Sequence, residues 1–227
     1  MFEKHLPENE VRALISAAHN TNDMLAQRDA AMMRALLHSG CRITEFHLID
    51  VKDAVFALNS RRLIIPKEHR KGGKRDHVVL VTAALESALQ DLLKIREQIT
   101  GSKTVDCGAF EALVVNRYCN RLSVRSFQLR VQFWACEAGL NKKVSPHWFR
   151  HTRGFNIMRK SNSTDPRGVV QQALGHASIA TTGIYTQATE DEVRAALETT
   201  DAGHQGIRTK RDAMTAWRAS HHAARGL

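Results

Sequence analysis

Apolar residues recur at helical spacing along most of this chain of 227 residues, which restricts it to a mainly helical fold. Pro7 and the acidic residues that follow it are typical of a helix start. Further periodic stretches predict helices over residues 23–39, 82–99, 123–138, 146–160, 165–175 and 189–199. The helix over 23–39 is expected to end at a capping Gly40. Its buried stripe is predicted to contain Met24, Met32, Met33, Leu36 and Leu37.

One stretch breaks the helical pattern. Between residues 51 and 82, short β-prone runs alternate with polar segments that are typical of turns. The runs at 54–57, 62–65 and 77–81 predict a small antiparallel sheet of three strands. The segment 67–76, between the last two runs, is dense in lysine, arginine and glycine. We therefore expect a mainly helical domain that carries a small sheet.

The chain contains 33 lysine and arginine residues against 23 aspartate and glutamate residues, a formal net charge of +10. This excess favours a polyanionic partner, nucleic acid first and an anionic membrane second, although charge alone fits an indifferent basic surface equally well. The four cysteines show no metal-ligand spacing and are typical of a reducing cytoplasm. No apolar stretch is long enough to span a membrane, and no secretory signal is visible. We expect a cytoplasmic protein without a membrane partner.

Several polar residues have a chemistry and spacing that suit phosphodiester transfer. Planar guanidinium groups, such as those of Arg42 and Arg150, bind the non-bridging oxygens of a phosphate bidentately. Glu45 follows Arg42 by three residues, so on a helix the two share a face. His147, Arg150 and His151 stand at i, i+3 and i+4, which also places them on one face. Any one of these residues alone would be an ordinary surface group, and only their order indicates a site.

A candidate nucleophile lies further along the chain. Tyr185 follows the turn Leu174-Gly175-His176 by nine residues and ends a segment that begins Thr181-Thr182. A phenol becomes nucleophilic when its proton is accepted or when positive charge stabilises its anion. The spacing of His147 and His151 also occurs in zinc sites. The zinc-protease motif requires Glu after the first histidine, however, and this chain has Trp148, so we expect no metal.

With these local contexts, the order resembles that of the tyrosine recombinase (phage integrase) family over roughly residues 6–189. The resemblance implies the helical catalytic domain of that family, with its small sheet. Glu45 would hold the first arginine, and His151 would pack or form a hydrogen bond within the core. His147 would act as general acid or base, and His176 would bind a phosphate oxygen or help to activate the tyrosine. The catalytic set that the resemblance implies is Arg42, Lys71, His147, Arg150, His176 and Tyr185.

The lysine of this set has an alternative. The segment Lys71-Gly72-Gly73-Lys74 resembles the turn on which the family places the lysine that protonates the departing 5′ oxygen. Lys71 is the expected general acid and Lys74 is the alternative. Lys74 and Arg75 are the expected DNA contacts. A basic turn in which neither lysine is catalytic also remains open.

The implied reaction needs no cofactor. Tyr185 would attack a backbone phosphate, form a 3′-phosphotyrosyl link and release a 5′ hydroxyl, without a metal or ATP. The implied partner is double-stranded DNA, on which family members act as homotetramers. Two alternatives share parts of this pattern: a type IB topoisomerase-like enzyme that relaxes DNA, and a DNA-binding regulator that keeps the fold but no longer cuts.

The order of segments suggests one catalytic domain over residues 1–201 and a basic C-terminal tail over 202–227. The tail is expected to pass to a neighbouring protomer, or to lie on DNA. Because Arg42 comes so early, we expect no separate N-terminal DNA-binding domain of the kind typical in the family. Two interpretations follow, an excised catalytic domain or a minimal recombinase, and both put independent tight DNA binding in question.

Overall fold

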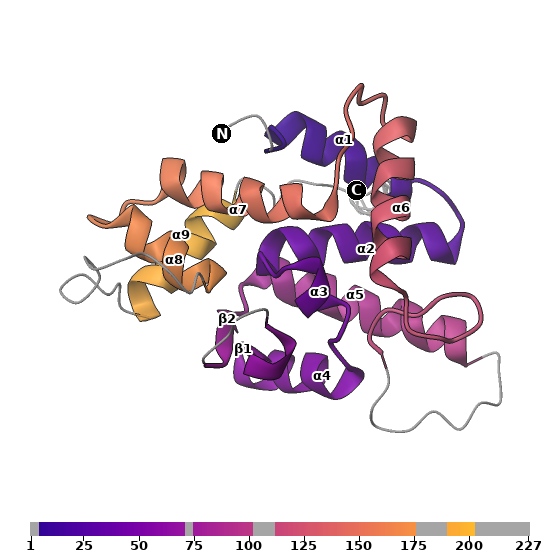
Figure 1. The fold of residues 1–227 in the computed structure, drawn as a ribbon, viewed down its shortest axis with the longest axis horizontal. Helices are drawn as coiled ribbons and strands as arrows, with labels where there is room; N and C mark the ends of the chain where they lie inside the picture. The colour runs from indigo at the N-terminus through magenta and orange to yellow at the C-terminus, as the bar shows by residue number, and fades with distance from the viewer. Residues whose placement is uncertain (1–4, 71–74, 102–111, 176–189, 203–227) are drawn as a thin grey trace, which may run out of the picture.

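The computed structural model describes residues 5–70, 75–101, 112–175 and 190–202 (Figure 1). Its helices are α1 (Glu8–His19), α2 (Met24–Ser39), α3 (Ile43–Phe46), α4 (Val51–Ser60), α5 (Ala83–Thr100), α6 (Val124–Glu137), α7 (Pro146–Lys160), α8 (Pro166–Leu174) and α9 (Glu190–Ala202). Its strands are β1 (Arg62–Ile65) and β2 (His77–Leu80), and a short 3₁₀ helix covers Lys67–His69. The predicted mainly helical fold is confirmed. No helix in these described ranges is both long and apolar enough to cross a membrane.

Helix α2 lies at the centre, with α1, α5 and α7 packed against it (Figure 1). Because neighbours cover it on several sides, Met32, Met33 and Leu36 are fully enclosed. Gly40 ends the helix as predicted, with a left-handed φ of 63°. Met24 was predicted to share the buried stripe, but it is 42% exposed because it begins the helix beside exposed residues.

The predicted three-stranded sheet is wrong in one strand. Within the described residues, β1 and β2 pair antiparallel, with Arg62 opposite Leu80 and Ile65 opposite His77. The first of the three predicted strands along the chain, residues 54–57, is instead part of helix α4, which packs beside β1.

The local chemistry of α4 explains this difference. The Asp53 carboxylate accepts the backbone N–H of Asp50 at 2.9 Å, which satisfies a donor at the helix start. Ala54 and Ala57 are buried one turn apart, whereas Phe56 is 50% exposed. Four consecutive apolar residues fit a strand or a helix equally well, so the acidic first turn and the helix-favouring alanines determine the outcome.

A second apolar cluster holds α8 and α9 against α7 and β2. It is formed by Leu80, Ile157, Val169, Ala173, Val193, Ala196 and Leu197. Asp201 closes this end of the domain, because its buried carboxylate accepts hydrogen bonds from Thr82 and Arg153 and lies 2.9 Å from His38 Nδ1. Burial alone would raise the pKa of Asp201, but Arg153 and His38 outweigh it and hold that pKa well below its usual range. Helix α9 is thereby fixed to α2, α5 and α7.

A buried ionic cluster joins α2 to α6. Asp29 is fully buried and accepts hydrogen bonds from Arg28 Nη2 at 2.6 Å and from Trp134 Nε1 at 2.9 Å. Arg130 of α6 donates to the same carboxylate. Arg28 also donates to the carbonyl of Val115 at 2.8 Å, which attaches the segment before α6 to the core. One carboxylate therefore holds two helices together.

We expect Asp29→Asn to lower the free energy of unfolding by about 3–5 kcal/mol, because it leaves the guanidinium groups of Arg28 and Arg130 without their buried counter-charge. Urea unfolding followed by circular dichroism measures this change. Asp191→Asn, at an exposed position of α9, is the matched control and should leave stability unchanged. Equal stability of the two variants would contradict the structural role of Asp29.

Candidate active site

The ends of α2 and α8 meet at one point. Gly40 has a left-handed φ, and a Cβ placed on it would lie 2.5 Å from Cδ2 of Leu174. A larger residue at position 40 would therefore be strained by the left-handed φ, and the Leu174 side chain would have to shift. The chain then continues through Cys41 and Arg42 into α3, so the glycine brings the first candidate arginine beside the end of α8.

Arg42 and Glu45 form a closed contact at the start of α3. The backbone N–H of Arg42 donates to Glu45 Oε2 at 3.0 Å, and Arg42 Nη1 donates to Glu45 Oε1 at 2.7 Å. The carboxylate is 1% exposed, whereas the Arg42 side chain remains 31% exposed. The expected pairing is present, although Arg42 precedes the helix and does not share a helical face with Glu45. A buried anion thus orients a partly exposed guanidinium.

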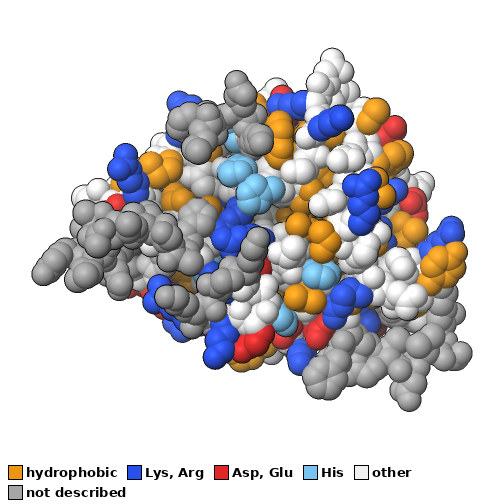
Figure 2. Space-filling view, in the orientation of Figure 1, with side chains coloured by type: hydrophobic (Ala, Val, Ile, Leu, Met, Phe, Trp, Pro, Cys, Tyr) orange, Lys and Arg blue, Asp and Glu red, His pale blue; other side chains and the backbone are white. Residues whose placement is uncertain are grey.

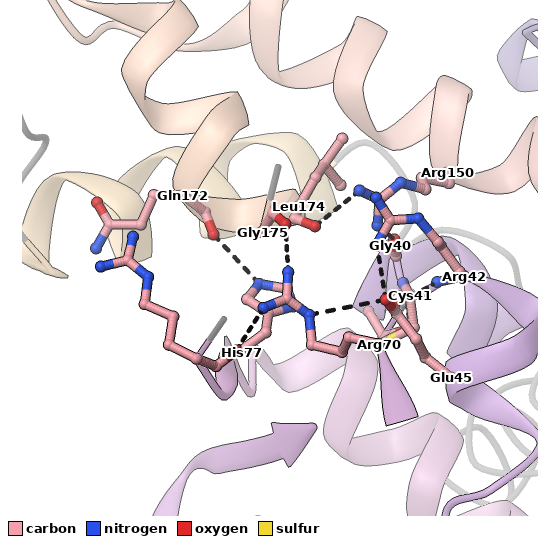
Figure 3. Close-up of polar contacts among 12 residues, drawn as sticks. Gly40, Cys41, Arg42, Glu45, Arg70, His77, Arg150, Gln172, Leu174 and Gly175 are labelled. Carbon is pink, nitrogen blue, oxygen red and sulfur yellow. Dashed lines mark hydrogen bonds and ion pairs between the residues drawn. The ribbon is translucent and has the colours of Figure 1, made fainter. Parts of the chain in front are cut away.

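Arg150 approaches the same point from α7. Its Nη1 donates to the carbonyl of Gly40 at 2.7 Å and its Nη2 to the carbonyl of Leu174 at 2.8 Å (Figure 3). Arg150 is 3% exposed, and burial together with the nearby Arg42 lowers its pKa to about 10. The guanidinium therefore stays charged at neutral pH. Its position is set by the C-terminal ends of two helices, and the two bonds use only part of its donors.

The thiol of Cys41 lies between these charged groups and is inert. Cys41 is 2% exposed, and burial raises the pKa of its thiol to about 12. The nucleophilic form of cysteine is the thiolate, and a thiol with so high a pKa forms almost none of it at neutral pH. Cys41 therefore acts as a small apolar residue beside Arg42.

His147 and His151 lie on the outer side of α7. Both are exposed, and their ring centroids are 4.4 Å apart in an edge-to-face arrangement. Arg150, between them in sequence, is turned toward the core. The three residues therefore do not share one helix face as predicted, because the two histidines are exposed whereas Arg150 is buried. Figure 2 shows histidine side chains beside lysine and arginine side chains near the middle of one face of the molecule.

Arg70 was not predicted as a site residue, yet its side chain is only 7% exposed. Its Nη2 donates to the carbonyl of Gly175, its Nη1 donates to the carbonyl of Arg75 at 2.7 Å, and its Nε lies 3.8 Å from Glu45 Oε1 (Figure 3). In the sequence Arg70 is one of several cations in a basic segment. No local pattern distinguishes it from its exposed neighbours, so only tertiary contacts identify it.

His77 is a second buried group that the motifs did not indicate. It begins β2, is 6% exposed, and its Nε2 lies 3.2 Å from the carbonyl of Gln172, which indicates that Nε2 carries the proton. Its Nδ1 has no hydrogen-bond partner within the described part of the chain. A Cβ on Gly175 would lie 2.6 Å from the imidazole ring. Burial, and then the charge of Arg70, lower the pKa of His77 to about 4.

The structure brings Arg42, Glu45 and Arg150 together and leaves His147 and His151 exposed on α7. Arg75 is described and exposed. The other predicted site residues lie outside the described residues, namely Lys71, Lys74, His176 and Tyr185. Within the described ranges no group of three or more His, Cys, Asp or Glu residues could hold a metal ion.

The low pKa of His77 predicts a loss of stability in mild acid. In the unfolded chain the imidazole takes up a proton near pH 6.5, whereas the folded protein does so only near pH 4. Between these values the unfolded state binds more protons, so the free energy of unfolding should fall as the pH falls, by at most about 3 kcal/mol in total.

Urea unfolding across this pH window measures the effect. His77→Gln keeps a donor for the Gln172 carbonyl without titrating, so it should flatten the pH dependence relative to the wild type. His69→Gln, at a half-buried position before β2, is the control and should retain the wild-type slope. An unaltered slope in His77→Gln would show that other groups cause the pH dependence.

Comparison with known proteins agrees with the resemblance seen in the motifs. The model of the phage integrase family matches residues 4–192. Tyrosine recombinase XerC of Neisseria meningitidis serogroup B (strain ATCC BAA-335 / MC58) is 32% identical over 190 residues, which cover 84% of this chain and 58% of that protein. XerC of Shewanella amazonensis (strain ATCC BAA-1098 / SB2B) is 32% identical over 209 residues, covering 92% and 64%. The chain thus spans less than two thirds of the length of these relatives.

Solved structures show the same fold. The crystal structure of XerA recombinase is similar with a TM-score of 0.60 and 27% identity, covering 88% of this chain and 65% of that one. XerH site-specific recombinase bound to difH substrate, in a pre-cleavage complex, has a TM-score of 0.58 and 23% identity, covering 77% and 47%. The family match, the relatives and the fold lead to one conclusion: the chain belongs to the phage integrase family.

Proposed function

We propose that this chain is the catalytic domain of a site-specific DNA recombinase that cuts and rejoins strands through a tyrosine. The observation that carries the proposal is the convergence of Arg42 and Arg150 beside the buried Glu45, where α2, α7 and α8 meet. The relatives named above are tyrosine recombinases, and XerH is described as bound to its DNA substrate. Membership of the phage integrase family supports the same reaction.

The charges at this point favour binding of a phosphate. Burial first and the nearby Arg42 second lower the pKa of Arg150, whereas Glu45 raises it, so the two guanidinium groups repel one another and Glu45 opposes that repulsion. A phosphodiester between them would relieve the repulsion, and its non-bridging oxygens accept hydrogen bonds from both. Because the protein fixes both groups before substrate arrives, they stabilise the crowded, negatively charged phosphorus of the transition state without reorganisation.

The remaining roles follow from the family motifs. Tyr185 Oη attacks the phosphorus, the bond from phosphorus to the 5′ oxygen breaks, and a lysine of residues 71–74 protonates that oxygen. His147 exchanges the proton of the tyrosine, and His176 binds a phosphate oxygen. Exposed His147 stands one helical turn from Arg150, which supports this assignment. The phosphotyrosyl link retains the energy of the broken bond, so a 5′ hydroxyl can reverse the step without ATP.

The partner we propose is double-stranded DNA, bound by a homotetramer of the chain in the cytoplasm. The net charge of +10 supports a polyanionic partner, and Lys74 and Arg75 belong to the basic segment 67–76. We propose residues 1–201 as the catalytic domain. The basic tail, residues 202–227, would connect protomers.

Trapping the covalent intermediate tests the proposal. Nicked, fragmented DNA from the source genome is incubated with the protein and denatured in detergent, and protein-linked DNA is sequenced. Wild type and Tyr118→Phe should form adducts that converge on one sequence, because Tyr118 is 63% exposed and belongs to no motif. Tyr185→Phe should form none. Adducts spread over all sequences would favour a topoisomerase, and salt-sensitive binding without adducts would favour a regulator.

Arg150→Lys should lower the rate of adduct formation by about 10²-fold, because an ammonium group cannot bind two carbonyls and a phosphate at once. The rate is measured at saturating DNA, with urea unfolding as a check on folding. Arg159→Lys, on the exposed part of the same helix, is the control. If both variants react at the wild-type rate, Arg150 does not bind the phosphate.

A further inference from the structure

We propose that Arg70 is a positioning residue for the arginine pair that binds the phosphate, Arg42 and Arg150. It connects the carboxylate that holds Arg42 to the helix end that holds Arg150, and thereby sets the spacing and orientation of the two guanidinium groups. This inference rests on the proposed function and gives a role to a residue outside the motifs.

The first connection runs through the carboxylate of Glu45. Its Oε1 accepts the hydrogen bond from Arg42 Nη1 at 2.7 Å, and the same oxygen lies 3.8 Å from Arg70 Nε, within ion-pair distance. That Nε is buried and makes no hydrogen bond within the described part of the chain, so the carboxylate is its counter-charge. Because Glu45 is buried as well, water cannot replace either cation. A movement of Arg70 would therefore shift the anion that orients Arg42.

The second connection runs through the end of α8. Nη2 of Arg70 donates to the carbonyl of Gly175 (Figure 3). Nη2 of Arg150 donates to the carbonyl of the preceding residue, Leu174, at 2.8 Å. The two arginines are thus anchored one residue apart on the same helix end. Arg70 thereby limits the movement of a backbone segment that positions Arg150.

The end of α8 is also held by other contacts on two sides. On one side, the ring of His77 packs against Gly175, and its Nε2 lies 3.2 Å from the carbonyl of Gln172. On the other side, the side chain of Leu174 lies against Gly40, the residue whose carbonyl accepts the other hydrogen bond of Arg150. Arg70 is therefore bonded to a fixed point of the fold.

The contacts of Arg70 distinguish it from an arginine that binds phosphate. Its side chain is 7% exposed, whereas that of Arg42 is 31% exposed. Its Nη1 donates to the carbonyl of Arg75 at 2.7 Å and its Nη2 to that of Gly175, so both Nη groups already bind the backbone. A planar guanidinium reaches these oxygens and a carboxylate in different directions, which an ammonium group cannot do. The position therefore requires the fork of donors and not the charge alone.

A neutral substrate provides a readout that is specific to the arginine pair. In a methylphosphonate, a methyl group replaces one charged non-bridging oxygen of the phosphate, so the transition state carries less negative charge for guanidinium groups to stabilise. A variant in which the pair is misplaced therefore loses more activity on the phosphodiester than on the methylphosphonate. A variant that is only less stable loses equally on both.

The test measures the rate of adduct formation by Arg70→Gln and Arg70→Lys at saturating DNA. The substrates carry a phosphodiester or a methylphosphonate at the cleavage site that adduct sequencing identifies. We expect both variants to lose about 10²-fold on the phosphodiester, the cost of displacing a catalytic group by about 1 Å, and much less on the methylphosphonate. DNA affinity should remain that of the wild type. Urea unfolding checks the fold, and Arg70→Lys serves if Arg70→Gln does not fold.

Arg34→Gln is the matched control. Arg34 also ties two elements together through its guanidinium, because its Nη1 donates to Asp91 at 2.7 Å and its Nη2 to Ser87 at 2.8 Å. It joins α2 to α5 and not to the arginine pair. Arg34→Gln should therefore cleave both substrates at the wild-type rate. Arg42→Gln removes one member of the pair and gives the substrate dependence expected for its loss.

A double variant separates positioning from direct contact with the phosphate. If Arg70 acts through the pair, its contribution is small once Arg42 is absent. Arg42→Gln combined with Arg70→Gln should then lose much less on the phosphodiester than the product of the two single losses. Direct binding of the phosphate by Arg70 would instead give losses that multiply.

Several outcomes would overturn the inference: wild-type cleavage by Arg70→Gln, equal losses on both substrates, or losses that multiply in the double variant. A wild-type rate in Arg70→Lys would also do so, because charge alone would then suffice. If no protein cleaves the methylphosphonate, the double variant decides on the phosphodiester alone. Absence of any adduct with the wild-type protein would overturn the proposed function together with this inference, whereas normal cleavage by wild type and Arg70 variants alike would overturn only the role of Arg70.

Discussion

The buried carboxylate of Glu45 is the interaction on which the arrangement of the arginines depends. It accepts two hydrogen bonds from Arg42 and lies within ion-pair distance of Arg70, while Arg150 approaches from α7. Cations placed this close repel one another, and a buried charge without a partner is costly. Glu45 offsets both effects in part, so the guanidinium groups remain gathered and retain a net positive charge.

Backbone geometry makes that gathering possible. Gly40 and Gly175 both adopt left-handed conformations at helix ends, and each is in contact with a side chain that a Cβ would displace. Their carbonyl oxygens also accept hydrogen bonds, that of Gly40 from Arg150 and that of Gly175 from Arg70. The same two residues therefore end the helices, allow their close approach and position the cations. Partial negative charge at helix C-termini favours cations there.

The sequence predicted most of the helices and the order of the site motifs, and it failed where local signals were ambiguous. Residues 54–57 fit either a strand or a helix, and the acidic first turn of α4 made them helical. The contact of Arg42 with Glu45 was predicted from spacing, because it is local. Arg70 and His77 were missed, because their burial comes from α8, which lies about 100 residues further along the chain.

By itself, the sequence determined the helical class, the basic character and the motifs that place the chain in its family, because periodicity, charge and spacing are properties of neighbouring residues. Only the tertiary structure decided which cations are buried and which face solvent. Arg70 and Arg75 are both cations of one short basic segment, yet the first is enclosed and the second is exposed. Long-range packing of α8 against the sheet produces that difference, and no local pattern encodes it.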